Sequence, residues 1–424
     1  MVKFMDGEAD STTILVSDGC GPLLVDTLGQ LKPLRQRVFE YVRAQSSAAR
    51  SDISRALEIS PGSATTLTAD LIRAGLLREM AETERDQTRG RPRVALEIVP
   101  DAGFVIGIKL GDGVHTAVLA DFSGAMVSNA SMTVSRAVRP VTQMLDDVEA
   151  LMTLLLEKAG RGMEHVRGIG IGMAGLIDHT HGLVRWSPLL EARDQPFGAA
   201  AETRFARPVV LENDANMLTL AELWFGSGRA KSDFAVVTIE NGVGMGLVLN
   251  NELYRGSFGM GLELGHTKVQ MEGALCRCGQ RGCLEAYISD YALVREGATA
   301  LNLSLDQNVN ARAVLETLFK EASAGNPAAE KIFKRAGRFL ALGLSNVVHL
   351  FDPALIILSG KRMTYDFMYA GEVLTDVQQL TLSRGQMPCQ VEIHPHADLD
   401  WARGATARAL AQVTDMMFTA EAAG

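Results

Sequence analysis

One short stretch, residues 263–289, constrains the chain more than any other because it gathers four side chains that bind transition metals. Nine residues separate its histidine from the first cysteine, one residue separates the first two cysteines, and four separate the second from the third. Three thiolates and one imidazole complete a tetrahedral Zn²⁺ shell with no open position, which is typical of a structural site. The predicted zinc ligands are His266, Cys276, Cys278 and Cys283.

Two glycines within this stretch favour a metal-binding loop over the simpler alternative of a reduced thiol cluster. Gly279 and Gly282 allow the backbone to bend tightly enough to direct three sulfur atoms at one point. A plain thiol cluster explains neither the glycines nor the nearby histidine. Because thiolate and imidazole ligands together suit zinc, the sequence predicts structural Zn²⁺ as the cofactor.

The residues around these ligands resemble the signature of the ROK family, a group of repressors, open reading frames and sugar kinases. The similar pattern runs from Glu263 and His266 through the cysteines to Glu285 and ends at Ser289, and the resemblance covers about 95–412. In this family the two carboxylates and the histidine hold sugar hydroxyls. His266 is therefore expected to serve twice, with one ring nitrogen on zinc and the other facing the sugar.

A repeated strand-turn-strand pattern predicts the fold of the body. One unit occupies residues 104–121 and a similar unit returns at residues 234–249, each leading towards helices. Such a repeat indicates a duplicated α/β architecture. The family resemblance implies the actin-like (ribonuclease H-like, duplicated) two-lobe sugar-kinase fold, in which each turn would cradle a phosphate through backbone N–H groups.

The phosphate-binding elements depart from the kinase pattern of the family. The first turn carries Lys109 where the kinases have an acidic residue, and Asp112 where they have a second glycine. The second turn begins with Glu240, where the kinases have a glycine. The third element reads Ser359-Gly360-Lys361, where they have three glycines. Since a carboxylate repels ATP phosphates in a partly dry site, the chain is predicted not to be an enzyme. The alternative, that ATP still binds, stays open because backbone N–H groups do the cradling.

The sugar-binding elements are better preserved. Residues 212–216 match the family's Glu-Asn-Asp-x-Asn element, in which Asn213 would bond sugar hydroxyls and Asp214 corresponds to the kinase general base. Asp214 as the N-cap of the following helix is the structural alternative. Leu189 replaces a family asparagine. The predicted ligand is a hexose or amino-hexose, free or phosphorylated, held by Asn213, Asp214, Glu263, His266 and Glu285.

Residues 31–98 have a different character and are predicted to form a winged helix-turn-helix DNA-binding domain. Within it, residues 31–93 carry 12 Lys and Arg against 8 Asp and Glu, whereas the whole chain has a net charge of −9. A basic unit on an acidic body indicates an anionic partner for that unit alone. The alternative is a three-helix packing module. Residues 1–30 are expected to be a flexible arm, and residues 99–424 the sugar-binding domain with the zinc loop 263–289.

Two segments of this unit supply the candidate DNA contacts. The third predicted helix, about residues 60–74, presents short hydroxyl side chains that suit phosphates and base edges. The predicted wing tip, residues 88–93, is rich in arginines that can enter an A·T-rich minor groove. The candidate DNA-binding residues are Ser63, Thr65, Thr66, Thr68, Arg73, Arg89, Arg91 and Arg93.

Composition excludes several other classes of protein. Three of the five cysteines are assigned to zinc, so a disulfide-stabilised secreted protein is not indicated and a reducing cytoplasm fits. The N-terminus lacks the basic start and long apolar run of a signal peptide. No apolar stretch reaches the length of a membrane span, so membrane insertion is not expected.

Together these observations predict a transcriptional regulator of sugar uptake or metabolism genes, most simply a repressor, whose binding to operator DNA is modulated by the sugar. It is expected to act as a homodimer or higher homo-oligomer on a near-palindromic site. Two alternatives remain open. One is a sugar kinase with an added DNA-binding domain, and the other is a repressor controlled by a protein partner from sugar transport.

Overall fold

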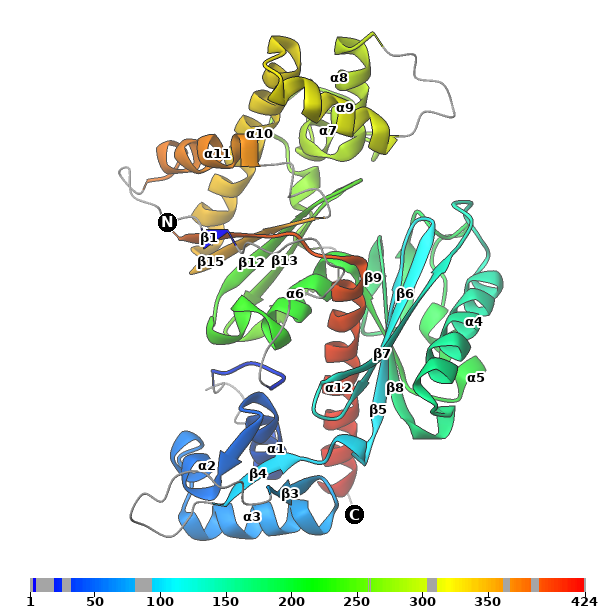
Figure 1. Ribbon diagram of the computed structural model, residues 1–424, viewed down its shortest axis with the longest axis vertical. Coiled ribbons are helices and arrows are strands. Elements are labelled where there is room, and N and C mark those ends of the chain that lie inside the picture. Colours follow the sequence, from blue (N-terminus) through cyan, green and yellow to red (C-terminus); the bar gives the residue numbers. More distant parts are fainter. Residues whose placement is uncertain are drawn as a thin grey trace.

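The computed structural model describes nine stretches of the 424-residue chain. They form a small N-terminal unit and two lobes, and each of the two lobes is built on one mixed sheet (Figure 1). These stretches are residues 3–4, 19–24, 32–80, 94–257, 259, 261–302, 311–360, 367–382 and 389–422.

The N-terminal unit contains three helices and a three-stranded antiparallel sheet of order β2-β4-β3. The elements are α1 (Leu34–Ala44), β2 (Ser47–Ala49), α2 (Arg50–Ala56), α3 (Pro61–Arg73), β3 (Leu77–Glu79) and β4 (Ala95–Ile98). Helix α3 lies where the third helix was predicted, at about residues 60–74, whereas β2 was not expected. Ser60 starts α3 as the sequence suggests, because its hydroxyl accepts a hydrogen bond from the Ser63 N–H at 3.0 Å.

The first lobe is built on a five-stranded sheet of order β11-β8-β5-β6-β7. Its strands are β5 (Phe104–Leu110), β6 (Val114–Asp121), β7 (Met126–Thr133), β8 (Val166–Met173) and β11 (Val209–Asn213), preceded by the short helix η2 (Pro100–Ala102). The helices α4 (Val141–Ala159), η3 (Met163–His165) and α5 (Phe197–Phe205) and the hairpin β9 (Leu176–Asp178) and β10 (Leu183–Trp186) complete this lobe.

The second lobe repeats this arrangement in a sheet of order β1-β16-β15-β12-β13-β14. Its strands are β1 (Lys3–Phe4), β12 (Phe234–Ile239), β13 (Val243–Leu249), β14 (Glu252–Tyr254), β15 (Leu355–Ser359) and β16 (Gln390–His394). Its helices are η4 (Ser227–Ala230), η5 (Leu264–His266), α7 (Glu285–Ile288), α8 (Asp290–Ala300), α9 (Ala311–Ser323), α10 (Pro327–Phe351) and α11 (Phe367–Leu380). In each sheet an antiparallel meander of three strands continues into two parallel strands, so the predicted duplication is confirmed.

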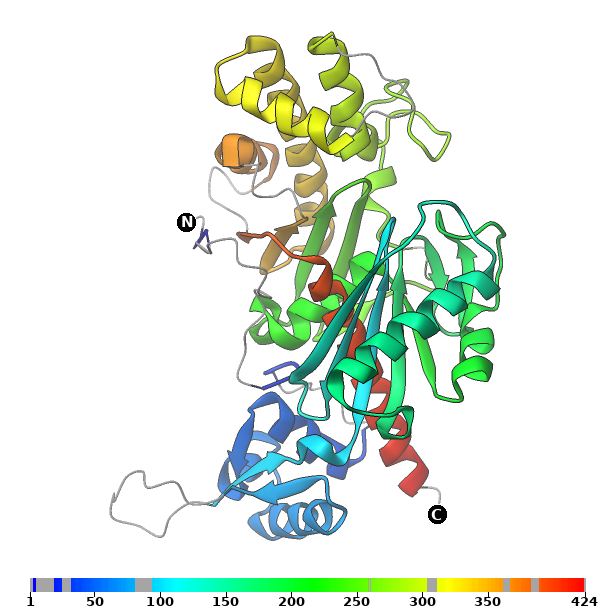
Figure 2. The ribbon, with the colours of Figure 1, turned by 45° about the vertical axis from the view of Figure 1, so that its right-hand side comes forward.

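Two helices, α6 (Asp214–Phe225) and α12 (Asp398–Ala422), lie between the sheets (Figure 1). Figure 2 shows α4 on one face of the first sheet and α12 on the opposite face. The approach of α12 is close enough to require glycine in the sheet, since a Cβ on Gly170 would lie 2.2 Å from the Ala405 carbonyl oxygen. Helix α12 therefore packs tightly against the backbone of the first sheet.

The far end of α12 packs against α1 of the N-terminal unit. Gln36 donates a hydrogen bond to Asp415 at 2.6 Å, and the buried Arg43 donates one to Thr414 at 3.0 Å. The rings of Phe39 and Phe418 lie 5.7 Å apart. One continuous apolar cluster thus includes residues of the N-terminal unit, α6 and α12. The N-terminal unit is docked on the body rather than tethered to it.

The prediction of a flexible arm over residues 1–30 is wrong for residues 19–24. The Cys20 N–H donates to the Arg43 carbonyl and the Gly21 N–H donates to the Trp224 carbonyl, both at 2.9 Å. Arg229 returns a hydrogen bond to the Gly21 carbonyl at 2.9 Å. These residues therefore form part of the joint between the N-terminal unit and the body. Lys3 and Phe4 pair with β16, and the other residues of the predicted arm lie outside the described residues.

Among the helices of the described stretches, none combines the length and the apolar composition that crossing a lipid bilayer requires.

Candidate metal centre and binding site

The loop from η5 to α7 is folded by its own backbone hydrogen bonds. The Val269 N–H donates to the Gly282 carbonyl at 2.9 Å, and the Cys276 N–H donates to the Gln280 carbonyl at 2.8 Å. Gly279 and Gly282 have φ angles of +86° and +76°, so both adopt the conformation that the sequence analysis expected of them. At Gly282 no other residue fits, since a Cβ would lie 1.8 Å from the Gln270 carbonyl oxygen.

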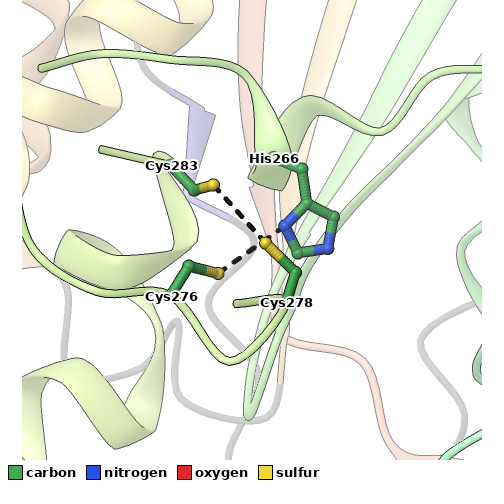
Figure 3. A group of neighbouring side chains, drawn as sticks. All are labelled: His266, Cys276, Cys278 and Cys283. Atoms are coloured by element: carbon green, nitrogen blue, oxygen red, sulfur yellow. Dashed lines mark hydrogen bonds between the residues drawn. The ribbon is translucent and has the colours of Figure 1, made fainter. Parts of the chain in front are cut away.

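This folding brings the four predicted ligands together (Figure 3). The three sulfur atoms and one ring nitrogen of His266 all lie within 4.8 Å of one another, so the group could hold a metal ion. The Sγ of Cys276 is 3.7 Å from Nδ1 of His266, and the Sγ of Cys278 is 3.7 Å from that of Cys283. Three sulfurs and one imidazole nitrogen match the donor set of a closed tetrahedral site.

Polar neighbours support negative charge on the sulfur atoms. The Lys268 ammonium donates to the Sγ of Cys283 at 2.9 Å, and this contact raises the pKa of Lys268. The Tyr291 hydroxyl lies 3.6 Å from the Sγ of Cys276. Donors of this kind stabilise thiolates, which are the form that binds metal.

The metal loop also positions the predicted sugar ligands that lie in the second lobe. Nδ1 of His266 faces the sulfur atoms, and its other ring nitrogen points away from them (Figure 3). Glu263 immediately precedes η5, and its carboxylate interacts electrostatically with His266. Glu285 begins α7 and is buried. Metal binding and the placement of these side chains are therefore linked through one short loop.

Asn213 and Asp214 come from the first lobe, at the junction of β11 and α6. Asn213, rather than Asp214, is the N-cap residue of α6, because its side-chain oxygen accepts a hydrogen bond from the Ala215 N–H at 2.9 Å. Its amide group also donates to the Gly175 carbonyl at 2.8 Å. Asn213 therefore has one N–H left for a ligand, while Asp214 accepts from the adjacent Ala215 N–H at 2.9 Å.

Electrostatic coupling indicates that the carboxylates from the two lobes converge. The pKa of Glu263 is raised, mainly by desolvation and further by repulsion from Asp214 and Glu285, while His266 opposes the shift. Desolvation also raises the pKa of Asp214, with Lys109 opposing it and Glu240 adding to it. Asp214, Glu263, His266 and Glu285 therefore lie close enough to interact electrostatically.

Glu285 is largely committed to protein contacts. One of its oxygens accepts from the Val243 N–H at 3.2 Å, which belongs to the second predicted phosphate turn. The other lies 3.4 Å from the Tyr291 hydroxyl. This carboxylate therefore connects the metal loop with the turn between β12 and β13.

The first predicted phosphate turn is altered in a way that the sequence only partly foresaw. Lys109 does not simply remove a carboxylate, because its ammonium pairs with Asp398 at 2.9 Å and lies 3.9 Å from the centre of the Trp401 ring. Both partners are in α12. The lysine thus fastens the first lobe to α12 at the position where kinases of the family place an acidic residue.

Sequence reasoning missed an ion pair between a partly exposed arginine and a buried carboxylate next to the predicted sugar ligands. Arg255 donates to Glu212 at 2.6 Å, and the other oxygen of Glu212 accepts from the Asn216 amide at 2.9 Å. Glu212 and Asn216 belong to the predicted sugar-binding element at residues 212–216, but these contacts are with protein groups. Arg255 follows β14 and gave no sequence signal, since an isolated arginine in a polar turn is ordinary.

The candidate DNA contacts on α3 divide into two groups. Ser63, Thr65, Thr66 and Arg73 are exposed, as expected. The expectation that Thr68 faces outward is wrong: it is fully buried, and its hydroxyl accepts from Arg50 at 3.1 Å and donates to the Ala64 carbonyl at 2.8 Å. Arg89, Arg91 and Arg93 lie outside the described residues.

Comparisons with known proteins place these features in context. The model of the ROK family matches residues 105–412. The xylose repressor of Caldicellulosiruptor bescii is 27% identical over 352 residues, which cover 81% of this chain and 86% of that repressor. The glucokinase of Thermotoga maritima is 33% identical over 279 residues, which cover 64% of this chain and 84% of that enzyme.

Among solved structures, a ROK family transcriptional regulator described as a homologue of the Escherichia coli Mlc protein has the same fold. Its TM-score is 0.76 at 23% sequence identity, and the match covers 91% of this chain and 98% of that one.

Proposed function

Because the chain belongs to the ROK family, we propose that it is a sugar-responsive transcriptional repressor of sugar uptake or metabolism genes. The observation that carries this proposal is the N-terminal unit docked on the actin-like body through α12. The alignment with the xylose repressor covers 81% of the chain, whereas that with the glucokinase covers 64%. The likeness to a repressor thus includes more of the chain than the likeness to a kinase.

The N-terminal unit is proposed to be a winged helix-turn-helix whose recognition helix is α3. Three helices followed by the β3–β4 ribbon suit this motif, and the exposed hydroxyls of Ser63, Thr65 and Thr66 suit contacts with phosphates or base edges. Arg73 at the end of α3 adds positive charge, although it also pairs with Asp70 at 2.8 Å. The wing arginines Arg89, Arg91 and Arg93 are proposed to reach the minor groove.

The effector is proposed to be a hexose or amino-hexose bound between the lobes by Asn213, Asp214, Glu263, His266 and Glu285. Ionised carboxylates accept hydrogen bonds from several sugar hydroxyls, and these groups come from both lobes. A ligand that bonds to both lobes favours one of their relative arrangements. Since α12 contacts both lobes and α1, such a change would also move the proposed DNA-binding unit.

The ion held by His266, Cys276, Cys278 and Cys283 is proposed to be Zn²⁺. The donor set of soft thiolates and one imidazole supports this choice, as does the Lys268 ammonium on the Sγ of Cys283. When bound, the ion would fix the loop that carries Glu263, His266 and Glu285.

The chain is further proposed to lack kinase activity. The ion pair between Lys109 and Asp398 occupies the first phosphate turn, and Glu240 adds negative charge where phosphates would approach. Asp214 would then be a hydrogen-bond acceptor for the sugar rather than a general base. A homodimer on a near-palindromic operator is also proposed, since the symmetry of such a site mirrors that of a dimeric repressor.

The test is selection of genomic DNA fragments by the purified chain, repeated with a panel of sugars at fixed salt concentration. The proposal expects a few fragments to be enriched and one sugar to release them. Thr66→Ala should weaken enrichment without loss of folding, and Asp112→Asn should leave it unchanged. Enrichment that no sugar alters would favour control by a protein partner from sugar transport. Absence of enrichment would contradict DNA binding and make ATP-dependent phosphorylation of hexoses the next assay.

A further inference from the structure

A second group of metal-binding side chains lies buried where β16 leads into α12. It consists of Glu222 from α6, His394 at the end of β16 and His396 two residues later, and all three are almost completely inaccessible to solvent. One ligand atom from each lies within 4.8 Å of the others. Among the described residues, the loop with three cysteines and His266 is the other such group.

One oxygen of Glu222 lies close to a ring nitrogen of each histidine, and its contact with His394 is a hydrogen bond. Nδ1 of His394 lies 2.6 Å from Oε1 of Glu222, and Nε2 of His396 lies 3.0 Å from the same oxygen. The second contact does not have the geometry of a hydrogen bond, so Nε2 of His396 is buried without a hydrogen-bond partner among the described residues. Buried polar atoms without a partner are rare, and an ion bound to this nitrogen and to Glu222 would satisfy it.

The other polar atom of each side chain is held by an outer partner. Nε2 of His394 lies 3.0 Å from Glu392, and Nδ1 of His396 lies 2.8 Å from the Ser359 hydroxyl. Oε2 of Glu222 accepts from the Ser227 N–H at 3.0 Å. Ligating histidines commonly give their second nitrogen to a carboxylate, a carbonyl or another polar group, which fixes the tautomer and the ring orientation. All three side chains therefore have the outer contacts expected of metal ligands.

The surrounding charge also favours a cation. Asp400, in the first turn of α12, is fully buried and interacts electrostatically with His396. Its Oδ2 accepts from the Ala397 N–H at 2.9 Å, whereas Oδ1 has no hydrogen-bond partner among the described residues. Carboxylates from Glu222, Glu392 and Asp400 thus interact with the two buried imidazoles. Buried charges require a compensating partner.

We propose that Glu222, His394 and His396 bind a divalent first-row transition ion, such as Zn²⁺ or Fe²⁺, at a second metal site. Two imidazoles and one carboxylate suit these ions. The three ligands come from α6, β16 and the segment that leads into α12, so the ion would hold the first turn of α12 in place. The other end of α12 packs against α1. This proposal does not depend on the proposed function, because it concerns metal content alone.

The test is the number of metal equivalents bound by the full-length chain after it is saturated with Zn²⁺ and freed of excess ion. Two equivalents are expected for the unmodified chain, and one for Glu222→Gln or His396→Gln. Cys278→Ser should retain one equivalent, held at the second site. His165→Gln, which changes an exposed histidine, is the control and should retain two.

Titration with Co²⁺ distinguishes the two sites spectroscopically. The cysteine site gives sulfur-to-cobalt charge-transfer bands, whereas a site of imidazole and carboxylate gives only d–d bands. Glu222→Gln should keep the charge-transfer bands and lose the other set. One equivalent of metal in the unmodified chain would overturn the proposal, since Glu222 and the two histidines would then form only a hydrogen-bonded network. This result does not require the variants to fold. Two equivalents in a folded Glu222→Gln chain would also overturn it.

Discussion

The proposed sugar-binding group and the predicted phosphate turns depart to different extents from the kinase pattern of the family. The sugar-facing group, which is Asp214, Glu263, His266 and Glu285, keeps the residue types of that pattern, and its members interact electrostatically. In the first phosphate turn, Lys109 pairs with Asp398 and stacks on Trp401, so the turn makes a structural contact with α12. A kinase needs both parts, whereas a sensor needs only the first.

This difference supports the proposal that the chain binds a sugar without transferring a phosphoryl group to it. Phosphoryl transfer depends on positioning and electrostatic stabilisation of the phosphates, which a carboxylate such as Glu240 opposes. Sugar binding depends on hydrogen-bond acceptors and donors, which persist. The following predictions test whether the two parts are as independent as this comparison requires.

The largest effect is expected for Cys276→Ser, which should abolish metal binding at the loop and disorder the sugar-facing group. Structural zinc contributes roughly 10–16 kcal/mol to the folding of small zinc modules, so its loss should lower the melting temperature strongly. DNA binding should fall as well. Metal analysis and thermal unfolding measure the effect, with Cys389→Ser as the control outside the cluster. Full stability and DNA binding in a metal-free chain would refute the structural role of the ion.

Asp214→Asn should weaken sugar binding while leaving the fold intact. Hydrogen bonds to a charged group contribute about 1.5–3 kcal/mol, so the dissociation constant for the sugar should rise by roughly 10- to 100-fold. Isothermal titration calorimetry measures this change. Asp112→Asn, on the phosphate side, is the matched control and should bind sugar normally. Equal losses in the two variants would break the distinction between the two parts.

Lys109→Met should destabilise the body without restoring phosphoryl transfer. The change removes the contacts with Asp398 and Trp401, and because Asp398 is partly exposed we expect a loss of about 1–2 kcal/mol. A fall of a few degrees in melting temperature should follow. A gain of ATP-dependent hexose phosphorylation in this variant would show instead that the lysine alone blocks an otherwise complete kinase site.

The smallest effect is a gradual dependence of sugar affinity on pH. The folded-state pKa values of Asp214 and Glu263 are raised, so these acceptors become protonated at a higher pH than ordinary carboxyl groups. Affinity should therefore decrease as the pH falls through the raised pKa, by about tenfold per unit for one essential proton. The same shift means that protonation of these two groups favours the folded state, so unfolding at these residues does not explain the loss. Affinity that is constant down to the ordinary carboxyl pKa would contradict their role.

Local spacing predicted that His266 and the three cysteines come together in a group that could hold a metal ion, because all four side chains lie within one short loop. The duplicated sheets were also predictable, since the strand-turn-strand pattern recurs in the sequence. Thr68 was misplaced because the hydroxyl residues of α3 were treated as one face, although Thr68 lies one helical turn after Ala64, on the buried side.

The contacts that sequence reasoning missed join distant parts of the chain. Glu222 and His394 are 172 residues apart, and no local pattern connects a helix glutamate with a histidine at the end of the last strand. Lys109 and Asp398 are 289 residues apart. The sequence therefore showed that Lys109 departs from the kinase motif, but it could not predict the contact that Lys109 makes with Asp398. The docking of residues 19–24 could not be predicted either, because their hydrogen-bond partners lie in α1, α6 and η4.

The most direct test of the account is the affinity of the chain for its selected operator, measured at fixed salt with each sugar of the panel and without ATP. We expect that one sugar lowers operator affinity by about tenfold or more, which corresponds to a coupling free energy of about 1.4 kcal/mol. An operator affinity that no sugar changes, or that changes only when ATP is added, would contradict the claim that sugar binding alone controls the repressor.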